Sequence, residues 1–200
     1  MTTTPRTRLS PEQRREQLLD LGVRLLAHRS LDELSIDLLA EEAGISRGLL
    51  YHYFGSKQAF HEAVVRHAAD DLIAQTTPPT GGEPMVRLLT SVTAYVDYVI
   101  DNHEGYVSLV KAAAGGNESL RAIYEDARSA LNGRIFREDT AGQILTDTPL
   151  ARLVVRGWSA MTEELVLAWI DDPHDISRDE LVAIVVASLP AVVGALPEGS

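Results

Sequence analysis

Residues 36–60 read IDLLAEEAGISRGLLYHYFGSKQAF, a run in which a glycine and a serine separate two short apolar stretches. Ser35 is placed to cap a short helix over residues 36–43, and Gly44 stands where a helix end favours left-handed backbone. Ser46 follows at once as the cap of another short helix. Two short helices joined by a tight glycine turn predict a helix-turn-helix unit.

The second short helix is predicted to have two unlike faces. At about 100° per residue, the apolar side chains gather on one side: Leu49, Leu50, Tyr53 and Phe54. The other side carries Arg47, Gly48, Tyr51 and His52. In a helix-turn-helix this helix lies in the major groove, so we expect the polar face to contact DNA. A glycine there costs about 1 kcal/mol of helix stability relative to alanine, and it would let the backbone approach the DNA closely.

Three further cations are predicted to contact the DNA backbone. Lys57 opens the next helix, where a cation and free backbone N–H groups together suit a phosphate. Arg6 and Arg8 precede the first helix and are predicted to act as an arm on a phosphate or in the minor groove.

The remaining sequence predicts an all-α fold of about nine helices, because helix signals recur and sustained strict alternation is absent. The expected helices cover 11 to about 28, 36–43, a third after residue 46, 57–75, 85–103, 105–114, 117–138, 149–170 and a last one from 178. Pro190 is expected to kink or end that last helix. The run TTPPTGGEP at 76–84 is the expected boundary.

We therefore divide the chain into three parts. Residues 1–57 form the helix-turn-helix DNA-binding domain with its N-terminal arm, and residues 58–78 a connecting helix. Residues 79–200 form a larger helical domain for effector binding and dimerisation.

Composition limits the function classes. The 200 residues are 45% hydrophobic and include no cysteine, which excludes disulfides and zinc–thiolate sites and favours the cytoplasm. No apolar run reaches the roughly 18 residues needed to cross a bilayer. The net charge is −11, yet the first 68 residues contain nine basic and nine acidic side chains, so the excess negative charge lies beyond them. The acidic total therefore does not exclude a DNA partner for the first domain.

The stretch at 36–60 resembles the DNA-binding signature of the TetR family of one-component transcriptional regulators. The resemblance implies a helix-turn-helix domain followed by a helical domain that binds an effector and forms a homodimer through its last two long helices. It also implies DNA contacts, with Ser35 and Tyr51 at the backbone, Arg47, Gly48, Leu49 and His52 in the major groove, Lys57 at a phosphate, and Ser46 at the helix start. Leu49 stands where a small hydroxyl residue is common, and Asp37 places an acid near the groove.

The second domain suggests a mostly apolar ligand site between two long helices. The candidates share aromatic, apolar or small polar character at helical spacing, and they are Tyr95, Tyr98, Asn102, Trp158, Met161, Thr162 and Leu165. Such stripes also form ordinary helix cores, so this alternative stays open. Glu163 and Glu164 favour a cationic or hydrogen-bond-donating effector.

No sequence motif indicates catalysis, a cofactor or a metal site. A GxSxG turn, a Walker loop, a GxGxxG fingerprint and an HExxH helix are all absent. The expected protein is thus not an enzyme but a homodimeric cytoplasmic transcriptional regulator. We expect a repressor that binds a palindromic operator in double-stranded DNA and is released from it by a small-molecule effector, with no membrane partner. The competing hypothesis is a helical ligand-binding or scaffold protein that does not engage DNA.

Overall fold

The computed structural model describes residues 10–138 and 145–196, and within these ranges the chain is all helical, with nine helices and no strand. The helices are α1 (Pro11–Leu26), α2 (Ile36–Ala43), α3 (Arg47–Phe54), α4 (Lys57–Gln75), α5 (Pro84–Asp101), α6 (His103–Ala114), α7 (Glu118–Glu138), α8 (Pro149–Asp171) and α9 (Arg178–Val193). The predicted fold class is confirmed.

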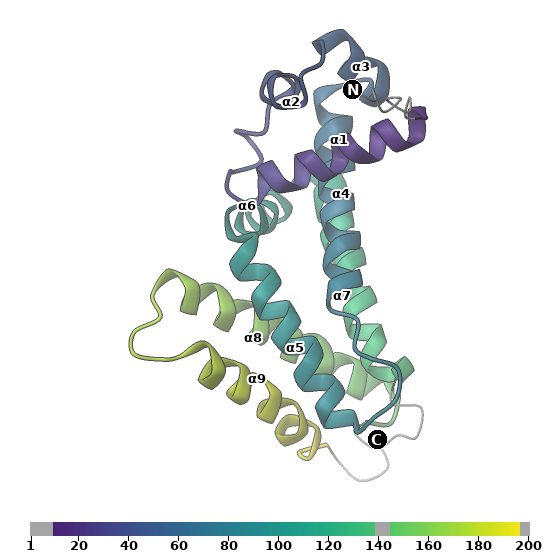
Figure 1. Ribbon diagram of the computed structural model, residues 1–200. Helices are drawn as coiled ribbons and strands as arrows, with labels where there is room; N and C mark the ends of the chain where they lie inside the picture. The colour runs from purple at the N-terminus through teal and green to yellow at the C-terminus, as the bar shows by residue number, and fades with distance from the viewer. Residues whose placement is uncertain (1–9, 139–144, 197–200) are drawn as a thin grey trace, which may run out of the picture.

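The helices form two groups joined by a long pair (Figure 1). Helices α1, α2 and α3 gather at one end, and α5, α8 and α9 pack together at the other. Helices α4 and α7 run side by side between the two ends. The molecule therefore has a small head, formed by α1–α3 and the start of α4, that is carried on a larger helical body.

Local sequence signals position most helix ends. Ser10 and Ser177 each form a capping box, with Gln13 and Glu180 respectively, at the starts of α1 and α9. Pro190 does not end α9, which continues to Val193, so of the two expected effects only a kink stays a prediction. Proline lacks one backbone donor, and so close to the helix end that loss affects a single hydrogen bond.

The head and the body share a hydrophobic core. Buried side chains of α1–α4 pack with three residues of α7, namely Leu120, Ile123 and Ala127. A second core joins α5, α8 and α9. The division into 1–57, 58–78 and 79–200 stays a prediction, and the packing does not follow its last boundary, because α7 contributes to both ends.

Helix α6 approaches the end of α1 very closely. A Cβ on Gly105 would lie 2.5 Å from the Leu26 carbonyl oxygen, so only glycine fits without a shift of backbone. Just beyond α1, the Leu31 N–H donates to Ser108 Oγ at 2.8 Å. These two contacts hold the head against α6.

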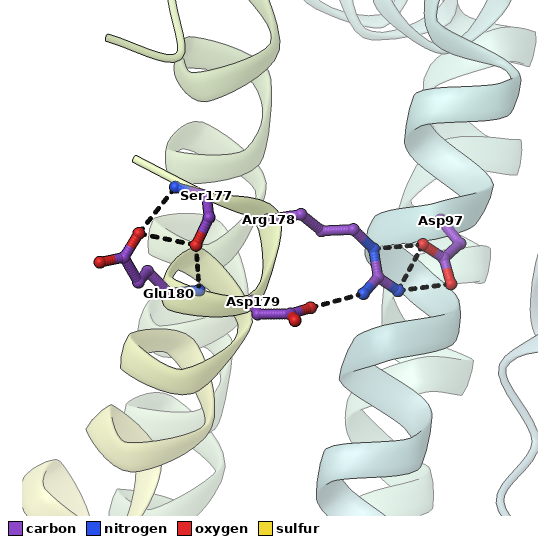
Figure 2. A network of polar contacts seen from close by, with 5 residues as sticks. All are labelled: Asp97, Ser177, Arg178, Asp179 and Glu180. Carbon is purple, nitrogen blue, oxygen red and sulfur yellow. Dashed lines mark hydrogen bonds and ion pairs between the residues drawn. The ribbon is translucent and has the colours of Figure 1, made fainter. Parts of the chain in front are cut away.

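An ion pair fixes the start of α9 to α5 (Figure 2). Arg178 Nε and Nη2 donate to the two carboxylate oxygens of Asp97, each at 2.6 Å, and Nη1 donates to Asp179 at 3.1 Å. The hydrogen bonds from Asp97 are the main reason that the pKa of Arg178 is raised. The pair orients α9 on the body because a two-pronged arginine–carboxylate contact has a defined geometry.

Candidate DNA-binding face and ligand cavity

The turn between α2 and α3 is built by caps and a left-handed glycine. Ser35 Oγ accepts from the Leu38 N–H at 3.1 Å, and Ser46 Oγ accepts from the Leu49 N–H at 3.3 Å. Gly44 ends α2 with φ of 63°, a backbone conformation that disfavours other residues. Both serine hydroxyls therefore have structural roles as caps, and their contacts with DNA stay predictions.

Helix α3 buries one face and exposes the other. Leu50 is 0% exposed and Phe54 is buried against the core, whereas Leu49 is 36% exposed. The outward residues are Arg47, Gly48, Leu49, Tyr51 and His52. Leu49 thus belongs to the exposed face, as the family resemblance implies, and not to the apolar face on which its helical angle placed it.

Gly48 is not required by the protein's own packing. A Cβ built there would meet only Ser46 Oγ, at 3.9 Å, and Gly48 is exposed. A larger side chain would therefore fit in the isolated chain. The packing of the chain itself therefore gives no reason for a glycine here, and close approach of the Gly48 backbone to DNA stays a prediction.

The start of α4 lies beside α3 and adds a cationic helix end. Ser56 Oγ accepts from the Ala59 N–H at 3.1 Å, and Lys57 is exposed at the first helical position. Arg15 of α1 places its guanidinium 5.3 Å from the ring centre of Phe54. The sequence analysis missed Arg15 as a cation on this side of the head, because its position depends on how α1 packs on α3.

Asp37 and Arg47 form an ion pair at the edge of the exposed face, between Arg47 Nε and the Asp37 carboxylate. Their side chains are 57% and 69% exposed, respectively, so water surrounds the pair. The acid that the sequence placed near the groove therefore contacts the arginine expected to read bases. Arg6 and Arg8 lie outside the described residues.

A cavity opens between α5, α7 and α8 at the end of α4. Its volume is ≈ 850 Å³, counting the space at its mouth. Three of the predicted ligand residues line it, namely Tyr95, Trp158 and Thr162. The other lining residues are Thr76, Pro78, Pro84, Arg87, Leu88, Ser91, Val92, Leu131, Asn132, Arg134, Ile135 and Ser159.

Tyr98 and Asn102 line a different cavity of ≈ 620 Å³, which lies among α1, α4, α5, α6 and α7. Their polar groups have partners within the protein. Tyr98 Oη donates to the Ala68 carbonyl at 2.8 Å, and Asn102 Nδ2 donates to the Tyr98 carbonyl at 2.9 Å. The residues predicted to form one ligand site thus lie in two cavities, because Tyr95 contacts Tyr106 whereas Tyr98 contacts α4.

A carboxylate held by tyrosines lies between these cavities. Glu163 accepts from Tyr106 Oη at 2.7 Å and from Tyr124 Oη at 2.6 Å, and the Tyr95 and Tyr106 hydroxyls are 2.9 Å apart. Burial raises the pKa of Tyr95, Tyr106 and Tyr124, so these hydroxyls keep their protons as donors. Glu163 is therefore satisfied internally, and it lines neither cavity. Glu164 is exposed. The expectation of a cationic effector loses its basis.

Two of the predicted ligand residues lie outside both cavities. Met161 and Leu165 are 38% and 37% exposed, and neither lines one of the two cavities. The buried sector of α8 centres on Val155, Thr162 and Val166, and Met161 and Leu165 lie on the adjacent sector of the same helix. The apolar side of α8 is therefore wider than the sector of the helix that packs against the other helices of the body.

The described residues lack two features that other classes of protein need. Within residues 10–138 and 145–196, no group of three or more histidine, aspartate or glutamate side chains could hold a metal ion. No helix in those ranges is long and apolar enough to cross a membrane.

Comparison with known proteins agrees with this geometry. Residues 18–64 match the model for bacterial regulatory proteins of the tetR family, and residues 84–192 match the model for the tetracyclin repressor-like C-terminal domain. The chain belongs to the TetR family of transcriptional regulators. It is therefore a helix-turn-helix DNA-binding regulator of transcription and a member of a non-enzymatic family.

Named relatives cover most of the chain. The regulator BetI of Paraburkholderia phymatum is 36% identical over 82% of this chain and 86% of its own length. The transcriptional activator FasR of Mycolicibacterium smegmatis is 24% identical over 88% of this chain and 80% of its own length. Some alignments are shorter: BetI of Burkholderia mallei is 37% identical over 43% of this chain and 46% of its own length.

Solved structures support the fold. A tetR-family regulator from Streptomyces coelicolor is 34% identical, with a TM-score of 0.81 over 92% of this chain and 82% of that one. A transcriptional regulator from a Rhodococcus species, 18% identical, has a TM-score of 0.74 over 90% of this chain and 98% of that one, and this likeness supports the fold alone.

Proposed function

We propose that the protein is a homodimeric repressor that binds a palindromic operator and is released from it by a small-molecule effector. The observation that carries the proposal is the exposed face of α3, where Arg47, Tyr51 and His52 stand outward while Leu50 and Phe54 anchor the helix. One such short helix reads too few base pairs for a genomic site, so two copies must act together.

The surface formed by α8 and α9 supports dimerisation. It exposes a set of large apolar side chains that a single subunit leaves uncovered, namely Leu150, Leu153, Met161, Leu165, Ile184 and Val192. At about 100° per residue, Met161 and Leu165 lie within roughly 60° of Trp158 around the axis of α8, so the two exposed side chains share one side of the helix. A second copy presenting the same surface would bury these side chains through a two-fold interface.

One side of α9 is used within the subunit and is not available for this surface. Leu181, Val185 and Leu189 are 5%, 0% and 0% exposed because they pack in the core shared with α5 and α8. Ile184, on the other side of α9, is 60% exposed. We therefore assign Ile184, with Met161 and Leu165 of α8, to the dimer interface.

The end of α4 supports a link between effector and DNA. Arg134 of α7 donates to the Ile73 carbonyl at 2.7 Å, and Ser91 of α5 donates to the Thr76 carbonyl at 2.9 Å. Thr76, Ser91 and Arg134 all line the α5–α7–α8 cavity. A ligand there would act on the end of the helix whose start carries Lys57. The ligand releases DNA only to the extent that it binds more tightly to the dimer conformation whose two heads are not spaced to fit the operator.

Selection of bound duplexes from a random pool tests the proposal. We expect a palindrome with half-site centres about 34–36 Å apart. On that duplex, Arg47→Ala should reduce discrimination at one base pair. Lys57→Ala should weaken binding to all sequences about equally and lower the salt dependence of binding by about one phosphate contact.

A pool without enrichment would favour a helical protein that does not engage DNA. A monomer in sedimentation at micromolar concentration would remove the dimer, and a reporter gene distinguishes repression from activation.

A further inference from the structure

Thr162 has a buried hydroxyl with no partner. The residue is 5% exposed and lines the α5–α7–α8 cavity. Its Oγ1 makes no hydrogen bond with any described part of the chain. A buried hydroxyl without a partner loses its bonds to water and gains nothing in return, so it is costly unless something else supplies the bond.

Three other threonines, Thr90 within α5 and Thr76 and Thr77 just beyond the end of α4, satisfy their hydroxyls locally. Thr76, Thr77 and Thr90 each donate from Oγ1 to the carbonyl four residues earlier, at 2.7, 2.9 and 2.9 Å. That bond is the usual one for a threonine within a helix. Thr162 does not make it, although α8 continues in both directions around it. Its hydroxyl, on a residue that lines the cavity, is thus left without a partner among the described residues.

The polar groups of two aromatic wall residues, Tyr95 and Trp158, are already engaged. Because Tyr106 donates its one hydroxyl proton to Glu163, the hydrogen bond between Tyr95 and Tyr106 is donated by Tyr95. Trp158 Nε1 donates to Ser188 Oγ at 2.9 Å, so the cavity meets the apolar ring of Trp158 and not its N–H. Tyr95 and Trp158 therefore present ring surface to the cavity, while the lining also includes the polar residues Asn132 and Ser159.

The charge of the wall disfavours a cationic ligand. The described lining contains two arginines, Arg87 and Arg134, and no carboxylate. Glu163, the nearest acid in sequence, is turned to Tyr106 and Tyr124. An ammonium group placed here would lose its hydration without gaining a counter-charge from the wall.

We propose that the effector is a compact aromatic molecule that carries a hydroxyl group and no positive charge, and that this hydroxyl hydrogen-bonds to Thr162 Oγ1 while the ring lies against Trp158 and Tyr95. The inference rests on the proposed function only in calling the ligand an effector. The binding step is independent of DNA.

Two probes of nearly equal shape test the hydrogen bond. 4-Fluorophenol and 4-fluorotoluene differ in a hydroxyl against a methyl group, and ¹⁹F NMR titration measures the affinity of each for the DNA-free protein at neutral pH. In Thr162→Val, which replaces the hydroxyl with a methyl group, we expect the affinity for 4-fluorophenol to fall about fivefold while that for 4-fluorotoluene stays the same or rises.

Two matched variants keep the test decisive. Thr162→Ser retains the hydroxyl and should retain the preference for 4-fluorophenol. Thr90→Val removes an exposed hydroxyl on α5 outside the cavity lining and should change neither affinity. Thr162→Val should remain folded, with a melting temperature equal to or above that of the parent chain, because a buried group without a partner has been removed.

The outcomes separate this inference from the proposed function. Equal changes for the two probes in Thr162→Val, or no saturable binding of either probe to the parent chain, would overturn the inference. If 4-fluorophenol binds through Thr162 but leaves operator affinity unchanged, the ligand class stands and induction by this ligand fails. If operator binding itself is absent, the proposed function fails while the titrations are unaffected.

Discussion

Two arginine–aspartate pairs in this protein have the same chemistry but differ in solvent exposure and in the number of hydrogen bonds they form. Arg47 contacts Asp37 through Nε on the head, where both side chains are more than half exposed. Arg178 contacts Asp97 through two nitrogens on the body, at 2.6 Å each, and its side chain is 34% exposed. The exposed pair can be exchanged for a contact with DNA at little cost, whereas the two-pronged pair holds two helices together.

The same contrast extends to the two functional regions. The face of α3 is anchored by apolar residues and leaves its polar groups to solvent. The cavity wall engages the polar groups of Tyr95, Trp158 and Arg134 within the protein, and among the described residues Thr162 Oγ1 has no partner. A surface that reads DNA needs available donors, while a cavity that selects one ligand needs few of them.

Leu50→Ala should have the largest effect, because Leu50 is 0% exposed and seats α3 on the head. We expect unfolding to become easier by about 2–5 kcal/mol, with loss of operator binding. Denaturant unfolding gives the first quantity. Leu49→Ala is the control, since Leu49 is 36% exposed, and it should change stability by no more than about 0.5 kcal/mol. Equal losses of stability in the two variants would contradict the two-faced description of α3.

Arg47→Ala should weaken operator binding by about 1–3 kcal/mol without changing the unfolding transition. The reason is that its guanidinium is exposed and its only described partner is another exposed side chain. Fluorescence anisotropy with the selected duplex, alongside thermal unfolding, measures both effects. Binding equal to that of the parent chain would show that α3 presents a different face to DNA.

Arg178→Lys should reduce the free energy of unfolding by about 0.5–1 kcal/mol at low salt, because lysine keeps the charge but cannot form the two-pronged contact. The loss should shrink as salt screens the pair. Arg156→Lys serves as the control, since Arg156 Nη2 is 3.9 Å from Glu125 and both side chains are largely exposed. If both variants lose the same stability, the α5–α9 pair has no special role.

Asp37→Asn should have the smallest effect and the opposite sign. Removing a negative charge beside the reading face should strengthen binding to the operator and to an unrelated duplex alike, by about two- to threefold at low salt. Parallel titrations of the two duplexes measure this. A selective loss of operator affinity would instead indicate that Asp37 orients Arg47 for base contact.

The DNA-binding face could be predicted from sequence because its determinants are local. The caps Ser35 and Ser46 and the left-handed Gly44 lie within a dozen residues, and the helical angle sorts Leu50 from Arg47. Leu49 was sorted to the wrong face by angle alone. It lies at the edge of the buried sector, where the packing of α1 and α4 decides exposure.

The cavity could be predicted only in part because it is a product of distant helices. Trp158 and Thr162 were identified by spacing along α8, but the same spacing also selected Met161 and Leu165, which belong to the exposed sector. Spacing gives the angle between side chains and not the direction in which a neighbouring helix lies. The separation of Tyr98 from Tyr95 depends on α6 and α7, which no local pattern of α5 specifies.

The close contact between Gly105 and Leu26 limits how regulators of this build can be recombined. A chimaera that exchanged the DNA-reading head at the loop between α4 and α5 would set a foreign α1 against this α6, where there is no room for even a slightly different approach. It would also cut through the core that Leu120 and Ile123 complete. The unit that can be transplanted intact is therefore the head together with α6 and the first half of α7, which are contiguous in space and not in sequence.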